Sequence, residues 1–179
     1  MSGKTINKIV QAGLFVAVGI LLPVVFHMFG LGSIFLPMHI PVLVAGMVIS
    51  WLYAAVVGAL TPVLSSVITG MPPAFPTMPM MVFELAAYGM FSSLLYRRFK
   101  LNIYLALLGS MVAGRIVAGI AVWILANFFA ASLPGPAAFI AGAVLKGMPG
   151  IIIQVVLVPA VVMFLERNSV IGKQKVVKG

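Results

Sequence analysis

Long apolar runs separated by short turn-forming or basic segments dominate this chain. The interruptions fall at residues 30–33, 70–77, 97–100 and 132–136. Between them lie apolar blocks at approximately 8–29, 36–69, 78–96, 101–131 and 137–165. About 20 apolar residues in a helix cross the hydrocarbon core of a bilayer, so each block is long enough for a span. The pattern therefore predicts an all-α integral membrane protein.

The second block, residues 36–69, is too long for one span. It would form a helix of about 50 Å, against a hydrocarbon core of about 30 Å. A turn near residues 50–54 is expected to divide it, with Trp51 and Tyr53 as interfacial anchors. The expected architecture is a single domain over residues 1–179 with six transmembrane helices. Their approximate bounds are 8–29, 36–50, 54–69, 78–96, 101–131 and 137–165.

Composition excludes a soluble protein. Hydrophobic residues make up 63% of the chain and charged residues only 7%, whereas an ordinary soluble domain is roughly one quarter charged. The mean hydropathy is +1.25. A water-soluble fold of this length could not bury so much apolar surface, so the bilayer is the expected environment.

The basic residues predict the topology. Nine of the eleven lie in three short polar segments. They are Lys4, Lys8, Arg97, Arg98, Lys100, Arg167, Lys173, Lys175 and Lys178. Basic segments beside membrane spans remain in the cytoplasm, so both termini and the segment at 97–100 are expected there. The net charge of +9 therefore reflects membrane topology, and no nucleic-acid partner is expected.

Three ionisable side chains fall inside the predicted spans. Glu84, Lys146 and Arg115 would lie about 9, 13 and 20 Å below the outer surface, from the rise of an α-helix. Charges at membrane depth are costly and are candidate functional groups. One carboxylate cannot neutralise two cations, so the surplus positive charge weakly favours an electron-rich or anionic ligand. The alternatives are a purely structural ion pair of Glu84 and a deprotonated Lys146.

Other polar residues extend the candidate substrate-binding site. Tyr88 follows Glu84 by one helical turn and Gln154 follows Lys146 by two, so each is expected on the same face as its partner. His39 is a possible ligand contact and His27 a weaker one. Two histidines without acidic or thiol partners make a poor metal site, so no metal is expected.

Two proline-containing segments add to this picture. Pro149 lies in the sequence Lys146-Gly147-Met148-Pro149-Gly150 and predicts either a broken helix that lines a binding site or a simple kink. Residues 70–76 contain three prolines and are expected to form a stiff connector or the cover of a pocket.

Familiar catalytic motifs are missing from the sequence. Cysteine is absent, and the patterns G-x-x-x-x-G-K-[ST], G-x-S-x-G and H-E-x-x-H do not occur. No catalytic residue is assigned, and the chain is not expected to bind ATP itself or to hold a cofactor.

Several segments together resemble the S components, or substrate-binding subunits, of energy-coupling factor (ECF) transporters. The resemblance covers nearly the whole chain. It is carried by the basic start leading into residues 12–19, by six short helices, by residues 35–42, by the loop at 70–73 and by Glu84-Leu85-Ala86-Ala87-Tyr88-Gly89. Each motif is degenerate, so the combination carries the likeness.

The resemblance implies a multi-pass protein of the bacterial cell membrane that binds a water-soluble vitamin or precursor. Its partners would be an ECF module, made of a transmembrane coupling subunit and two ATPase subunits that use ATP. The S component would topple in the bilayer to deliver its ligand. The pocket would lie toward the outside, among the later helices and the first and third loops.

The resemblance also implies a docking surface and a choice of ligands. The docking motif Ala-x-x-x-Ala corresponds to Gly13 and Ala17, with glycine in place of the first alanine. The segments around His39 and Glu84 favour pyridoxine or hydroxymethylpyrimidine, while the surplus cation favours pantothenate or niacin. The alternatives are a stand-alone ion-coupled secondary transporter and, less favoured, a small membrane enzyme.

Overall fold

The computed structural model describes residues 3–30, 32–129, 133 and 135–168. Lys173, Lys175 and Lys178, which belong to the predicted basic C-terminal segment, lie outside these residues. Part of the predicted outer loop at 132–136 also lies outside them.

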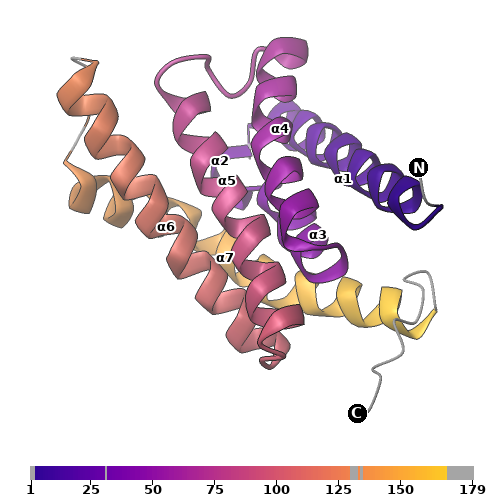
Figure 1. The fold of residues 1–179 in the computed structure, drawn as a ribbon. Coiled ribbons are helices and arrows are strands. Elements are labelled where there is room, and N and C mark those ends of the chain that lie inside the picture. The colour runs from indigo at the N-terminus through magenta and orange to yellow at the C-terminus, as the bar shows by residue number, and fades with distance from the viewer. Residues whose placement is uncertain (1–2, 31, 130–132, 134, 169–179) are drawn as a thin grey trace.

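The described chain is all-helical, as predicted (Figure 1). Five of its helices are long and apolar enough to cross a membrane, and a shorter apolar helix accompanies them. The elements are α1 (Gly3–Met28), α2 (Gly32–Phe35), α3 (His39–Val48), α4 (Trp51–Thr69), α5 (Thr77–Ser93), the π-helical turn η1 (Leu94–Arg98), α6 (Ile103–Phe128) and α7 (Pro136–Arg167).

The short helix α3 forms the centre of the bundle. All ten of its residues are buried, and α1, α4, α5 and α7 pack around it. At about 1.5 Å per residue it is about 15 Å long, roughly half the thickness of a hydrocarbon core. Leu36 adopts a left-handed conformation with φ of 49°, so α3 begins at His39, three residues after the predicted start.

The apolar block at 36–69 is divided between α3 and α4. Ile49 and Ser50 have extended backbones and separate the two helices. Trp51 and Tyr53, the predicted anchors, lie in the first turn of α4. The division therefore falls at the beginning of the predicted turn region.

Glycines bring α4 and α5 into close contact. A Cβ atom on Gly58 would overlap the backbone carbonyl of Leu85, and a Cβ atom on Gly89 would overlap that of Ala54. Each glycine therefore lets its helix approach the backbone of the other. Such close approach between small residues is a common way to pack helices in a bilayer, where lipid is as apolar as the side chains.

Polar contacts join α3, η1 and α7 at one end of the bundle. The Ser93 hydroxyl donates to the Ile49 carbonyl at 3.0 Å, and Arg97 donates to the Val48 carbonyl. The Tyr96 hydroxyl donates to Glu166 Oε1 at 2.9 Å. This end carries the basic residues Arg97 and Arg98 and is the predicted cytoplasmic end.

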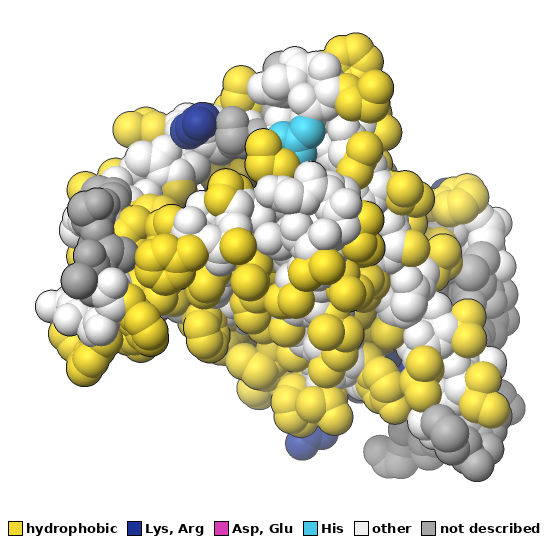
Figure 2. Space-filling model, turned by 90° about the horizontal axis from the view of Figure 1, so that it is seen from above, with side chains coloured by type: hydrophobic (Ala, Val, Ile, Leu, Met, Phe, Trp, Pro, Cys, Tyr) yellow, Lys and Arg dark blue, Asp and Glu magenta, His cyan; other side chains and the backbone are white. Residues whose placement is uncertain are grey.

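The surface suits a lipid environment. Large hydrophobic side chains are exposed on α1, α4, α6 and α7, including Val67 on α4 and Phe164 on α7. Figure 2 shows hydrophobic side chains over much of the face that carries the α4–α5 connection. The chain is a multi-pass membrane protein.

We predict that Gly58→Val lowers the stability of the purified protein, because the new side chain would collide with the α5 backbone. Overpacking of this kind costs about 1–3 kcal/mol or more. The matched control is Gly13→Val, since nothing lies within 4 Å of a Cβ atom at Gly13. Thermal unfolding in detergent should distinguish the two variants, and equal melting temperatures would contradict the packing described for α4 and α5.

Candidate ligand-binding site

A cavity of about 470 Å³ lies where α1, α2, the start of α3, the α4–α5 connection and α7 meet. Its volume is within the range of small-molecule sites. The lining residues are Pro23, His27, Gly30, Gly32, Leu36, Pro37, Met38, His39, Met71, Pro72, Pro73, Thr77, Met81, Arg115, Ala143 and Lys146.

The half-length helix α3 explains the place of this cavity. His39 is the first residue of α3 and also lines the cavity. A full-length helix would continue through this part of the bundle. Here an irregular segment, residues 36–38, replaces it and contributes three residues to the lining.

The α4–α5 connection covers one side of the cavity and is fixed to α4. The Ser65 hydroxyl donates to the Met71 carbonyl at 2.6 Å, and the Met71 amide donates to the Thr69 hydroxyl at 3.2 Å. Met71, Pro72 and Pro73 line the cavity. The proline-rich segment at residues 70–76 therefore covers a pocket, which is one of the two roles expected for it.

Glu84, Arg115 and His39 form a buried charged cluster beside the cavity. Arg115 Nη1 lies 2.7 Å from Glu84 Oε1, and His39 Nε2 lies 3.7 Å from the same oxygen. Oε1 has no hydrogen-bond partner of ordinary geometry among the described residues, so the Arg115 contact is a close ion pair rather than an aligned hydrogen bond. The three residues come from α5, α6 and α3, so the cluster connects three helices.

Both ring nitrogens of His39 lack a hydrogen-bond partner within the described part of the chain, although only 3% of the residue is exposed. Buried polar atoms in proteins are normally hydrogen-bonded, and exceptions are common at functional sites. Because His39 also lines the cavity, it is a candidate ligand contact.

Tyr88 packs behind this cluster. Its ring centroid lies 5.3 Å from that of His39, and a Cβ atom on Gly114 would overlap the Tyr88 ring. Gly114 directly precedes Arg115, so the tyrosine ring packs against the helix that carries the arginine. Tyr88 is buried and is not among the cavity-lining residues.

Lys146 enters the cavity wall from α7. It has no ion pair among the residues that the structure describes. It is accessible from the cavity side, and the exposed His27 of α1 also lines the cavity.

The structure therefore brings three of the six predicted substrate-binding residues to one cavity: His39, Arg115 and Lys146. Glu84 and Tyr88 lie directly behind it and contact residues that line it.

Gln154 is not brought to the cavity. It is 1% exposed, its side-chain nitrogen has no hydrogen-bond partner among the described residues, and it lies in the core. Eight residues of helix exceed two full turns by about 80°, which turns Gln154 away from the side of α7 that carries Lys146. α7 is continuous from Pro136 to Arg167, so Pro149 does not break the helix there.

Sequence reasoning missed most of the apolar lining. Leu36, Met38, Met81 and Ala143 contribute to the wall, but in an apolar sequence nothing distinguishes such residues from lipid-facing or core residues. Only their position after folding identifies them.

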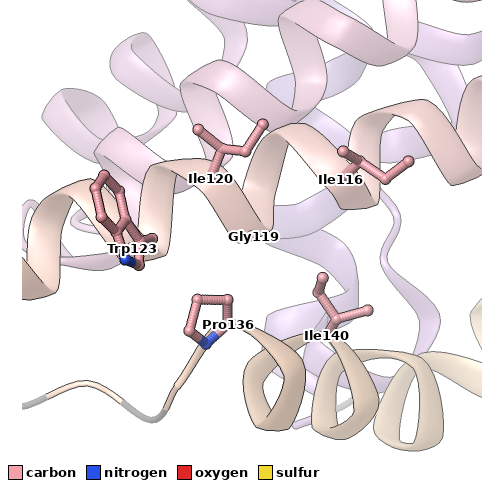
Figure 3. Close-up of a pocket in the computed structure, with 6 residues that line it drawn as sticks. All are labelled: Ile116, Gly119, Ile120, Trp123, Pro136 and Ile140. Atoms are coloured by element: carbon pink, nitrogen blue, oxygen red, sulfur yellow. The ribbon is translucent and has the colours of Figure 1, made fainter.

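A second cavity of about 370 Å³ lies between α6 and the start of α7 (Figure 3). Its lining residues are Ile116, Gly119, Ile120, Trp123, Pro136 and Ile140. This lining contains no ionisable group, so the cavity offers nothing to orient a polar ligand. Among the described residues, no group of three or more His, Cys, Asp or Glu side chains could hold a metal ion.

The fold and the cavity define a helical membrane protein with a small-molecule site inside its bundle. The family model described as the substrate-specific component of ECF transporters matches residues 7–162, and the chain belongs to this family. This confirms the resemblance seen in the sequence and makes the chain a transport subunit rather than an enzyme. No curated protein and no solved structure matches the chain.

We predict that Glu84→Gln destabilises the protein, because it leaves Arg115 buried without its counter-charge. Removing one partner of a buried ion pair costs about 3–5 kcal/mol. Glu84→Gln combined with Arg115→Met should recover part of this loss, since the second change removes the unpaired charge. Unfolding midpoints of the two single variants and the double variant measure the coupling; additive losses would contradict a direct ion pair.

Proposed function

We propose that this chain captures a water-soluble vitamin or vitamin precursor at the outer face of the bacterial cell membrane and delivers it inward. The observation that supports this best is the cavity lined by His39, Arg115 and Lys146 in a chain of the ECF substrate-specific family. A cavity that carries a few polar side chains and lies away from the basic end of the bundle suits a ligand that arrives from outside.

Delivery requires partner subunits in this proposal. The ECF module, with its coupling subunit and two ATPases, uses ATP, and the chain topples in the bilayer to carry the ligand across. Large apolar side chains are exposed along the long helices, and such a surface suits contact with hydrocarbon during this movement.

The first helix supplies the proposed docking surface. Gly13 and Ala17 are both exposed on α1, and nothing lies within 4 Å of a Cβ atom at Gly13. Val10, Leu14 and Leu21 beside them are more than 60% exposed. Small residues one turn apart allow the close approach of a second helix, and the surrounding apolar side chains can pack against it.

Two classes of vitamin fit different parts of the evidence. Pyridoxine and hydroxymethylpyrimidine, favoured by the resemblance of the His39 and Glu84 segments, would use ring nitrogens and hydroxyl groups as hydrogen-bonding partners. Pantothenate and niacin would place a carboxylate beside Arg115 and Lys146. Both classes are small enough for a cavity of about 470 Å³.

We expect uptake to depend on the ATPase subunits of the module. Cells that produce this chain should take up radiolabelled vitamin only when the module is also present and its ATPases are intact. A proton uncoupler applied to ATP-supplied membrane vesicles should leave this uptake in place. Uptake that persists without the ATPases and collapses with the proton gradient would instead identify a stand-alone ion-coupled transporter.

If α1 carries the docking surface, substitutions on it should affect assembly with the ECF module but not the binding of the ligand. Gly13→Leu and Ala17→Leu should prevent co-purification with the module, because the larger side chains keep the helices apart, and should leave ligand affinity unchanged. Gly142→Leu on α7 is the matched control, since Gly142 is exposed and also has nothing within 4 Å of a Cβ atom. Normal co-purification of both α1 variants would place the docking surface elsewhere.

A further inference from the structure

The charges around the main cavity are unevenly distributed. Arg115 and Lys146 line it together with two histidines, and its lining contains no carboxylate. Glu84 lies behind the lining, in contact with Arg115. In Figure 2 no acidic side chain is visible among the residues coloured by type. A ligand therefore meets two cations and two imidazole rings but no carboxylate in the lining.

Counting the charges gives a surplus of one. Arg115 is paired with Glu84 at 2.7 Å, while Lys146 has no ion pair among the described residues. Arg115, Lys146 and Glu84, two cations and one carboxylate, carry a formal net charge of +1. Lys146 is exposed at the wall of the cavity, and one negative charge on a ligand would supply the counter-charge that it lacks there.

The guanidinium group of Arg115 lies close to α7 and lines the same cavity as Lys146. A Cβ atom on Gly147 would lie 3.9 Å from Arg115 Nη2, and Gly147 directly follows Lys146 on α7. Glu84 engages Nη1, so Nη2 is the nitrogen turned toward α7. Because Arg115 and Lys146 line the same cavity, a ligand carboxylate bound there would share the cavity with both cations, and charge-assisted hydrogen bonds to a carboxylate are among the strong ones.

From this arrangement we propose that the ligand is a small monocarboxylate whose carboxylate group binds between Arg115 and Lys146. The rest of the ligand lies against the apolar part of the wall, including Leu36, Met71 and Met81. Glu84 acts as a positioning residue that holds Arg115 and His39 in place. This inference rests on the proposed function, because it names the substrate class of the same site.

The charge count also distinguishes a carboxylate from a phosphate ester. A phosphate monoester carries about −1.5 to −2 charges at neutral pH, more than the surplus of one. Its binding would leave net negative charge at membrane depth. The lining therefore favours a carboxylate over a phosphate group.

The test uses the purified full-length chain and pairs of probes that differ in the acid group. Nicotinate is compared with nicotinamide and pantothenate with pantothenol by titration calorimetry, with pyridoxine and pyridoxal phosphate as the neutral and phosphorylated probes. One carboxylate should bind, and its neutral partner should bind about 30-fold or more weakly, as expected when a buried charge pair loses one partner.

The variant Lys146→Met removes the surplus charge without leaving Glu84 unpaired, and the exposed position of Lys146 should allow it to fold. It should weaken binding of the carboxylate by a similar factor and so reduce the preference for the carboxylate over its neutral partner. Lys146→Arg should retain most of the affinity. Lys8→Met, on α1 and outside the cavity lining, is the control for loss of a lysine.

Tightest binding of pyridoxine or of pyridoxal phosphate would overturn the monocarboxylate assignment while leaving vitamin capture in place. Equal affinity for both members of each pair, or no binding of a carboxylate, would also overturn it. Failure of the proposed function is a separate result: no vitamin uptake would be seen even with the complete module.

Discussion

The ion pair between Glu84 and Arg115 is the interaction on which the rest of the site depends. Both side chains lie in an apolar bundle where neither charge is tolerated alone, and their close contact fixes α5 and α6 relative to each other. The same carboxylate oxygen lies near His39 on the central helix, so three helices meet at one negative charge. Tyr88 and Gly114 pack tightly beside this point and restrict how Arg115 can move. The pair therefore stabilises the fold and at the same time aims its cation at the cavity.

A second constraint is the length of α3. A helix of ten residues reaches across only about half of a bilayer, and the remainder of that path contains the irregular segment and the cavity. This space can remain unfilled because α4 and α5 pack closely against each other's backbone at Gly58 and Gly89. This packing fixes the helices that surround the cavity. The Ser65 and Thr69 contacts hold the cover. Close packing of α4 and α5 therefore accompanies a cavity on another side of the bundle.

The apolar pattern predicted the all-helical membrane fold because the bilayer dictates the lengths of the runs that can cross it. The division of residues 36–69 followed from their length, which exceeds one crossing of the hydrocarbon core. The lengths of the apolar runs do not predict which cation forms an ion pair with Glu84. The depths estimated from the sequence put Lys146 about 4 Å deeper than Glu84 and Arg115 about 11 Å deeper than Glu84. Lys146 was therefore the nearer cation by this estimate, yet Arg115 forms the ion pair. Such depths treat every helix as upright and ignore its rotation, whereas α6 and α7 run in clearly different directions in Figure 1. The same neglect of rotation placed Gln154 beside Lys146, although it is buried in the core.

These observations give one account, in which a buried ion pair presents cations to a small molecule held inside a lipid-embedded bundle. Native mass spectrometry of the gently purified full-length protein tests this account most directly. The account predicts a retained small molecule of vitamin size, present in stoichiometric amount and lost when Lys146 and Arg115 are both replaced by methionine. A protein that carries no such molecule after growth in rich medium, or that retains it equally well without the two cations, would contradict the account.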